Sequence, residues 1–225
     1  MHMWPNGRLL QMWAERLQSV GFTTEIADVR RATRAEPPDI RGIAFAWLGV
    51  HDDREALADV RAGLRDPYPP ARVEAARAAV MLGDDGAREH LRALLAVDWP
   101  ETAINAAAYL ADLGDPGGAS VIADAAVSPV EALRLQAVLA VRAFERFGGG
   151  PPASEASVAA PPIDVVAVLR RAALEDASPL VRREAVYQVA ALGRDRSAPI
   201  LKEAMRDQDP VVARAARLRV DGEAG

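Results

Sequence analysis

One twenty-residue pattern occurs twice in this chain, and it constrains the fold more than any other feature. DPYPPARVEAARAAVMLGDD begins at Asp66, and DASPLVRREAVYQVAALGRD begins 110 residues later at Asp176. Laid on each other without a gap, the two stretches share Asp, Pro, Arg, Glu, Ala, Leu, Gly and a final Asp. Such internal repetition is typical of stacked repeat architectures, in which one unit cannot bury its apolar face without a neighbour.

The dipeptide Leu-Gly marks the repeat period along the chain. Its glycines, together with that of one Phe-Gly, are separated by 34, 31, 34 and 45 residues. The last interval contains the segment GGGPPASEASVAAPP at 148–162, and removing about fourteen of its residues restores a period near 31. The pairs are Leu48-Gly49, Leu82-Gly83, Leu113-Gly114, Phe147-Gly148 and Leu192-Gly193.

Each unit contains the boundary signals of two helices. Proline suits the first turn of a helix, where its missing N–H would have no partner, and Gly supplies the left-handed residue that follows a helix. An Asp side chain can accept the free N–H groups at the start of the next helix. We therefore predict second helices that begin at Pro69 or Pro70, Pro100, Pro129, Pro179 and Pro210. The predicted helix-capping aspartates are Asp52, Asp84, Asp115 and Asp195.

The apolar spacing between these signals is helical. Side chains three or four residues apart fall on one stripe of each second helix. The chain is half hydrophobic, only 5% aromatic and rich in Ala, which is the strongest helix former and lets helices approach closely. These features predict an all-α fold. The matching stripes are Ala71, Ala75, Ala79 and Leu82 in one unit and Val181, Ala185, Val189 and Leu192 in the other.

The charge balance and the absent residue types exclude several classes of function. The net charge is −5, whereas nucleic-acid binders usually carry a basic surplus, so we do not expect a nucleic-acid partner. Without Cys, the chain has no disulfide framework, thiolate nucleophile or Cys-based zinc site. The N-terminal residues lack the apolar core of a signal peptide, and no apolar run approaches the length of a membrane span. We expect a cytoplasmic protein without membrane contact.

No residue pattern predicts catalysis, a metal or a cofactor. The histidines are His2, His51 and His90. Asp52 and Asp53 directly follow His51, but adjacent loop residues seldom converge on one metal. GGGPP lacks the Lys-Ser or Lys-Thr that completes a phosphate-binding loop, and no nucleophile elbow occurs. We therefore expect no catalytic residue, no metal and no cofactor, in a protein that is not an enzyme.

The pattern Asp-x-x-Pro-x-x-Arg-x-x-Ala…Leu-Gly resembles HEAT repeats, most of all the short repeats of the bilin-lyase-like HEAT proteins of bacteria. The resemblance extends over about residues 22–221. It implies a right-handed α–α superhelix of about six helix pairs. It also implies that the Asp and Arg of the motif are structural and bond neighbouring repeats. In the two best units the motif residues are Asp66, Pro69, Arg72, Ala75, Leu82 and Gly83, and Asp176, Pro179, Arg182, Ala185, Leu192 and Gly193.

The repeat boundaries divide the chain into five segments. Residues 1–21 are expected to form an N-terminal capping helix and residues 222–225 a polar tail. Repeats 1–4 occupy 22–147 and repeats 5–6 occupy 163–221, and the Pro/Gly-rich segment 148–162 between them is expected to be an inserted loop. The side chains expected to cover the first repeat are Leu9, Met12, Trp13, Leu17 and Val20.

The resemblance implies a function as well as a fold. In HEAT solenoids the second helices line the concave side, which is the usual binding surface, so we expect a non-enzymatic scaffold that binds a protein partner there. The predicted surface contains Trp, Tyr, Arg and Met, which are enriched at binding interfaces. A competing interpretation places Trp47 and Leu139 in the core. The predicted partner-binding residues are Trp47, Arg77, Met81, Asn105, Leu139, Arg183 and Tyr187.

Two kinds of HEAT-repeat enzyme are the alternatives, and a third kind is excluded. A bilin lyase or isomerase subunit shares the short repeat and would act on a small ligand. A HEAT-like DNA glycosylase would need aromatic side chains and an acidic residue on a basic concave face, which the net negative charge opposes. A di-iron hydroxylase would need recurring His-Glu pairs, and the sequence contains none.

Overall fold

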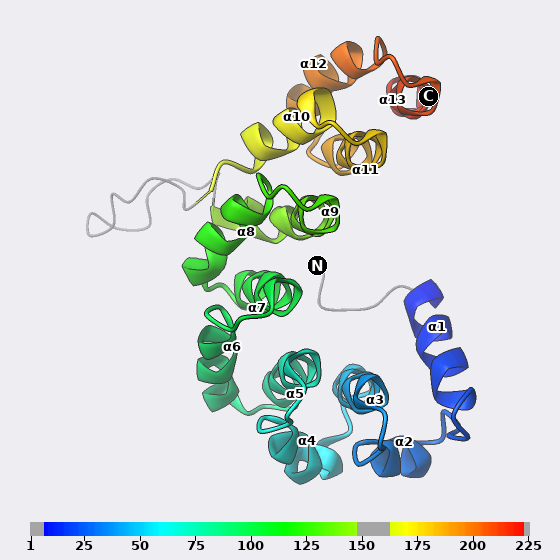
Figure 1. The fold of residues 1–225 in the computed structure, drawn as a ribbon, viewed down its shortest axis with the longest axis vertical. Coiled ribbons are helices and arrows are strands. Elements are labelled where there is room, and N and C mark those ends of the chain that lie inside the picture. Colours follow the sequence, from blue (N-terminus) through cyan, green and yellow to red (C-terminus); the bar gives the residue numbers. More distant parts are fainter. Residues whose placement is uncertain (1–6, 148–162, 223–225) are drawn as a thin grey trace. The chain divides into compact units, whose positions relative to one another are not determined.

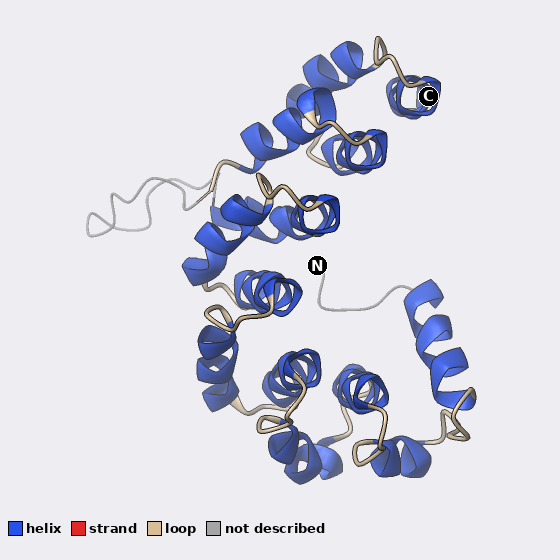
Figure 2. Ribbon diagram, viewed as in Figure 1, coloured by secondary structure: helices blue, strands red, loops and turns tan. Residues whose placement is uncertain are grey.

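The computed structural model describes residues 7–147 and 163–222, and within these ranges it contains helices and turns but no strand (Figure 2). The chain divides into two compact units, Met1–Asp115 and Pro116–Gly225, called unit 1 and unit 2 below. The predicted loop at 148–162 lies outside the described residues, as do residues 1–6 and 223–225. The all-α expectation is confirmed.

Unit 1 contains helix α1 followed by three helix pairs. In each pair a short first helix precedes a longer second helix, and Figure 1 shows the first helices α2, α4 and α6 in one row and the second helices α3, α5 and α7 in another. The bounds are α1 (Gly7–Gln18), α2 (Ile26–Ala32), α3 (Pro38–Val50), η1 (Arg54–Ala56), α4 (Leu57–Gly63), α5 (Pro69–Met81), η2 (Asp85–Ala87), α6 (Arg88–Leu94) and α7 (Pro100–Asp112).

Unit 2 contains three more helix pairs, in which α11 packs between α9 and α13. The expected six pairs are therefore present in the described ranges, and within each unit they stack as in an α-solenoid. The bounds are η3 (Pro116–Gly118), α8 (Ala119–Ala125), α9 (Glu131–Ala140), η4 (Val141–Phe147), α10 (Val165–Glu175), α11 (Pro179–Ala190), α12 (Arg194–Ala204) and α13 (Pro210–Gly222).

Proline opens five of the six second helices, as predicted for most of them. The helices α3, α5 and α7 begin 31 residues apart, and so do α11 and α13. The predicted start at Pro129 is wrong, because α9 begins at Glu131 and Val130 is its N-cap residue. Pro129 lies in the preceding turn, where it corresponds to Pro67 of the second repeat rather than to Pro69.

Glycine ends three of the second helices as predicted. Gly83, Gly114 and Gly193 have φ of 98°, 85° and 87°, a left-handed conformation that favours glycine. The assignment of Gly49 to the same role is wrong. Gly49 lies inside α3, and the left-handed residue after that helix is Asp52, with φ of 50°. The Leu-Gly interval of 34 residues therefore overstates the period, which is 31 here.

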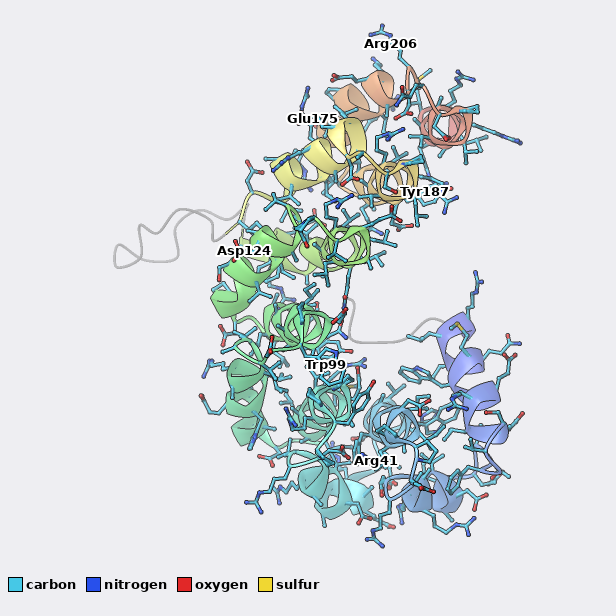
Figure 3. All side chains as sticks on the ribbon, viewed as in Figure 1. Arg41, Trp99, Asp124, Glu175, Tyr187 and Arg206 are labelled. Carbon is cyan, nitrogen blue, oxygen red and sulfur yellow. The ribbon has the colours of Figure 1, made fainter. Side chains whose placement is uncertain are left out.

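The repeat motif forms bidentate ion pairs between successive repeats. The guanidinium of Arg41 donates from Nε and Nη2 to Asp66 at 2.6 and 2.7 Å, and Figure 3 marks Arg41 on α3. Arg134 pairs with Asp176 and Arg182 with Asp207 in the same way. The third guanidinium nitrogen, Nη1, donates to two backbone carbonyl oxygens of the turn before the arginine's own helix; for Arg182 these belong to Asp176 and Ala177. The expected structural role of the motif is confirmed at these positions.

Arg72 departs from this arrangement. Its Nη1 donates to the carbonyl oxygen of Asp66 in its own turn at 2.8 Å, but no described carboxylate lies within ion-pair distance. The next turn has the same length, but Val97 holds the position that corresponds to Asp66, and Asp98 lies one residue later, so the aspartate is out of register. The ring of Trp99 packs edge-on against Tyr68 at this junction, with a centroid separation of 5.3 Å.

A second series of ion pairs joins the first helices to the inter-repeat turns. Arg30 pairs with Asp53, Arg61 with Asp84, and Arg92 with Asp115, always across 23 residues. The capping role predicted for Asp84 is wrong, and the one predicted for Asp115 stays a prediction. Asp84 precedes η2 without a side-chain cap bond, and the Arg61 guanidinium holds its pKa below the usual value.

The other two predicted caps are also wrong. Asp52 occupies the left-handed position and pairs with Arg54, and Asp195 lies inside α12.

An apolar cluster of unit 1 lies between α1 and the first two helix pairs. Leu17 of α1 is fully buried in it, and Leu10, Trp13 and Ala14 pack against it. The predicted stripe is only partly correct, because Leu9, Met12 and Val20 are exposed. None of the helices in the described ranges combines the length and apolar character that a membrane-spanning helix needs.

Candidate interaction surface

The register of the second helices determines which side chains face away from the core. In α11 the core stripe contains Val181, Ala185 and Val189, which are fully buried. The second, fifth and ninth residues of the helix lie on another side, because 100° per residue places them within one sector. Figure 3 shows Tyr187, the ninth residue, on the side of α11 turned away from α10.

The same three positions carry a consistent chemistry on the neighbouring helices of unit 2. The ninth residues of α9, α11 and α13 are apolar or aromatic and exposed, and Leu139 and Leu218 expose 50% and 58% of their surface. The fifth residues of α11 and α13 are both Arg. We call this surface the apolar–arginine face. It consists of Leu139 on α9, Leu180, Arg183 and Tyr187 on α11, and Val211, Arg214 and Leu218 on α13.

The arginines of this face differ from those of the ion-pair series. Arg183 is half-buried, its Nε has no hydrogen-bond partner, and no described carboxylate pairs with it. Arg214 and Arg217 are exposed and likewise unpaired within the described residues. Arg219 places its guanidinium 5.0 Å from the ring centroid of Tyr187, a cation–π contact that orients the phenol. The face is therefore apolar and cationic together.

Two predicted binding residues of unit 1 are buried instead. Arg77 is only 5% exposed: its guanidinium stacks 4.7 Å from the Tyr109 ring centroid and donates to Glu74 at 3.3 Å. The Tyr109 hydroxyl donates to the same carboxylate at 2.7 Å. Burial, followed by the charge of Glu74, raises the pKa of Tyr109, so its hydroxyl remains a donor. These three side chains form a partly buried polar cluster between α5 and α7.

Trp47 is 8% exposed and stacks on His51 with a centroid separation of 4.6 Å. It is the tenth residue of α3, and Ala46 holds the ninth position, so the predicted register was off by one. The competing core interpretation is correct for Trp47. It is wrong for Leu139, which is exposed.

The remaining predicted residues are partly accessible. Met81 is half-buried at the end of α5, and Asn105 on α7 lines a hollow of about 220 Å³ with Trp13, Ile43 and Glu74. The predicted residues thus fall into two sets. Leu139, Arg183 and Tyr187 come together on the apolar–arginine face of unit 2, and Arg77, Met81 and Asn105 belong to α5 and α7 of unit 1.

Sequence reasoning missed four contributors, namely Leu180, Val211, Arg214 and Leu218. The signal was available for two of them, because adding the period of 31 to Arg183 and Tyr187 gives Arg214 and Leu218. A larger groove of about 580 Å³ in unit 2 is lined in part by Arg134 and Asp176, which already bind each other. Within the described residues no three His, Asp or Glu side chains gather as a metal site would require.

Comparison with known proteins gives one matching family and several similar solved structures of low sequence identity. The family model for HEAT repeats matches residues 28–109 and 154–219. No curated protein matches the chain.

Among solved structures, an engineered protein is 17% identical with a TM-score of 0.51, covering 89% of this chain and 99% of its own. A computationally designed armadillo repeat protein for modular peptide recognition is 17% identical, with a TM-score of 0.44 and coverages of 96% and 94%. Human deoxyhypusine hydroxylase in complex with glycerol is 18% identical, with a TM-score of 0.34 and coverages of 92% and 87%.

Proposed function

The chain belongs to the HEAT-repeat proteins, and from that premise we propose that it is a non-enzymatic scaffold that binds another protein through the exposed faces of its second helices. The observation that carries the proposal is the apolar–arginine face. Contiguous exposed apolar side chains on a folded protein mark interaction surfaces, and Tyr and Arg are the residue types that dominate binding hot spots.

The face suits binding because its side chains project from rigid elements. The Arg182–Asp207 pair joins α11 to the turn that precedes α13, so the spacing of the two helices is set before a partner arrives. Pre-organisation of this kind reduces the entropy lost on association. Covering Leu139 and Leu218, each about half exposed, contributes roughly 1 kcal/mol apiece.

A non-catalytic role also agrees with the origin of the shifted carboxylate pKa values in unit 2. The pKa of Asp207 is lowered first by its hydrogen bonds from Arg182. For Asp176, burial favours the neutral form, but Arg134 and the amide of Ser178 outweigh it, and the pKa is again lowered. These carboxylates are held ionised by bonds that join repeats, and the structural role accounts for their shifts.

Photo-crosslinking tests the proposal. A benzoylphenylalanine is placed at Leu218 on the face, or at Arg171 on the exposed side of α10 as the control, and each protein is incubated with native lysate. We expect a protein adduct from position 218 that position 171 does not give. The double substitution Arg183→Ala with Tyr187→Ala should abolish the adduct while helicity and melting temperature stay near wild type, because both side chains lie outside the core stripe. Identical adducts from both positions, or an adduct that survives the double substitution, would contradict the proposal.

A further inference from the structure

We infer that the partner of the apolar–arginine face is an acidic polypeptide segment with apolar side chains between its carboxylates. The inference rests on the proposed function, because it specifies the chemistry of what the same face binds. It follows from three properties of the face: unpaired arginines, their regular placement between apolar residues, and the local charge balance.

The arginines of this face lie outside both series of inter-repeat ion pairs. Most arginines that join repeats, such as Arg41 and Arg182, donate hydrogen bonds to a carboxylate and to backbone carbonyl oxygens. Arg183 has the same planar donor array but no described acceptor, and its Nε is already removed from solvent. A desolvated donor without a partner is unfavourable, and an incoming carboxylate would satisfy it in a bidentate geometry.

The repeat period places these groups in parallel rows, called lanes below, that run from α11 to α13. Arg214 lies 31 residues after Arg183, and Leu218 lies 31 residues after Tyr187, so each pair occupies one position on adjacent helices. Packed helices are about 8–10 Å apart. Matching groups on a partner are therefore separated by about three residues of an extended strand, at roughly 3.3 Å per residue. A segment that alternates carboxylates with apolar residues can contact an arginine lane and an apolar lane at once.

The local charge balance permits such a segment to approach. Residues 1–115 contain 13 Arg against 18 Asp and Glu, which accounts for the whole net charge of −5. Residues 116–225 contain 14 Arg and Lys against 14 Asp and Glu. Unit 2 thus has no acidic surplus. Glu184, next to Arg183, already accepts a hydrogen bond from Gln188 at 2.9 Å.

The exposed apolar residues favour a peptide over a nucleic acid. Phosphate-directed binding depends on several basic contacts along a backbone and on a basic surplus. Here the arginine lane is bordered by Leu180 and Val211 on one side and by Tyr187 and Leu218 on the other. Aliphatic side chains of this kind gain from apolar partners and nothing from phosphates.

Selection from a displayed library of random dodecapeptides, with the purified full chain as bait, tests the inference. The wild-type bait should enrich peptides of net negative charge with spaced apolar residues. A bait with Arg183→Glu and Arg214→Glu should bind those peptides at least about tenfold more weakly and enrich basic ones, because two attractions become repulsions. The matched control, Arg171→Glu with Arg206→Glu, reverses two unpaired charges elsewhere in unit 2 and should select as wild type does. Circular dichroism melting of each bait confirms that it is folded.

The outcomes separate the inference from the proposed function. In one outcome, the selected peptides lose binding to the Tyr187→Ala variant and yet are neutral or basic. That result would overturn the acidic partner but not the proposal that this face binds proteins. A selection in which no enriched peptide depends on Tyr187 would overturn both. Tighter binding of a dT20 oligonucleotide than of any selected peptide, abolished by the charge reversal at 183 and 214, would replace the peptide with a nucleic acid.

Discussion

At the scale of single residues, Arg182 shows how one side chain connects two repeats. Its Nη1 donates to the carbonyl oxygens of Asp176 and Ala177 in its own turn, while Nε and Nη2 donate to the carboxylate of Asp207 in the next. Both members of the pair are nearly inaccessible. Removing one partner of such a pair leaves the other charge unpaired in a poorly solvated site, which lowers the free energy of unfolding strongly.

We predict that Arg182→Ala lowers the free energy of unfolding by about 3 kcal/mol, because it leaves the Asp207 carboxylate without its counter-charge and two carbonyl oxygens without the Arg182 donor. Urea unfolding followed by circular dichroism measures the loss. The matched variant is Arg170→Ala, which breaks an ion pair with Glu203 that is half exposed, and it should change stability by less than about 1 kcal/mol. Equal losses of unfolding free energy in the two variants would show that the inter-repeat ion pair stabilises the fold no more than an exposed one.

The outcome of sequence reasoning also differs residue by residue. Asp66, Asp176 and Arg182 could be predicted, because a motif that repeats for packing reasons has the same role wherever it is complete. Arg77 could not, because its burial depends on Tyr109, which lies outside the motif and contributes the ring and the second donor to Glu74. Trp47 was misplaced because Leu48-Gly49 was aligned with the later Leu-Gly pairs, whereas the left-handed residue after α3 is Asp52, three positions later.

At the scale of helices, α3 and α5 approach unusually closely. A Cβ on Gly49 would lie 2.9 Å from both the Cα and the Cβ of Ala78, closer than real contacts of this kind. The glycine therefore sets the separation of the first two second helices. The ninth position of α3 is also small, Ala46, so this part of unit 1 has no counterpart of the Arg77–Tyr109 stack.

We predict that Gly49→Ala destabilises the protein by about 1 kcal/mol or more, even though Ala is the better helix former by roughly that amount. The cause is the backbone of Ala78, which must move to admit the methyl group. Thermal melting measures the change. Gly42→Ala in the same helix is the control, because its Cβ would lie 3.5 Å from Ala71, an ordinary contact, and stability should hold or rise. A stabilised Gly49→Ala would mean that the helices are free to separate.

Helix boundaries were the element-level feature that local signals predicted best. Proline at the first position fixes φ where no N–H is needed, and it opens α5, α7, α11 and α13 as expected. The start of α9 was missed because its proline belongs to the turn. The ion pairs of the first helices were missed, although their arginines and aspartates recur every 31 residues. An Asp that follows a helix-ending glycine is usually interpreted as an N-cap of the next helix, and not as the partner of an Arg 23 residues earlier.

At the scale of the whole molecule, stability rests on ionised aspartates shared between successive repeats. Burial raises the pKa of Asp66, but the hydrogen bonds from Arg41 and from the amide of Tyr68 outweigh it and the net shift is downward. Asp176 and Asp207 are shifted in the same direction. A carboxyl with a lower pKa in the folded state stabilises the fold above the unfolded pKa of about 3.9 and loses that contribution as the pH falls through the folded value.

We therefore predict that the free energy of unfolding is nearly constant from pH 7 to about pH 5 through these groups and falls steeply below about pH 4. Urea unfolding at pH 7, 5 and 3 measures it. The triple variant Asp66→Asn, Asp176→Asn, Asp207→Asn should be less stable at pH 7 but should lose less between pH 5 and pH 3 than wild type. The exposed Asp195→Asn variant serves as the control and should follow wild type. If the triple variant lost as much unfolding free energy between pH 5 and pH 3 as wild type does, the acid sensitivity would come from other groups than these three aspartates.

The direction of the Arg–Asp pairs has a consequence for how such a chain can change in length. Each complete repeat donates from its guanidinium to its successor and accepts through its carboxylate from its predecessor, so the repeats with both groups in register are interchangeable in this respect. Excising residues 176–206, one whole period, would leave Arg134 facing Asp207 and Leu139 beside Leu218. The array would be shorter, with its inter-repeat charges matched and its apolar row unbroken. Duplication and loss of modules can therefore alter the extent of the apolar–arginine face while the types of side chain that form it stay the same.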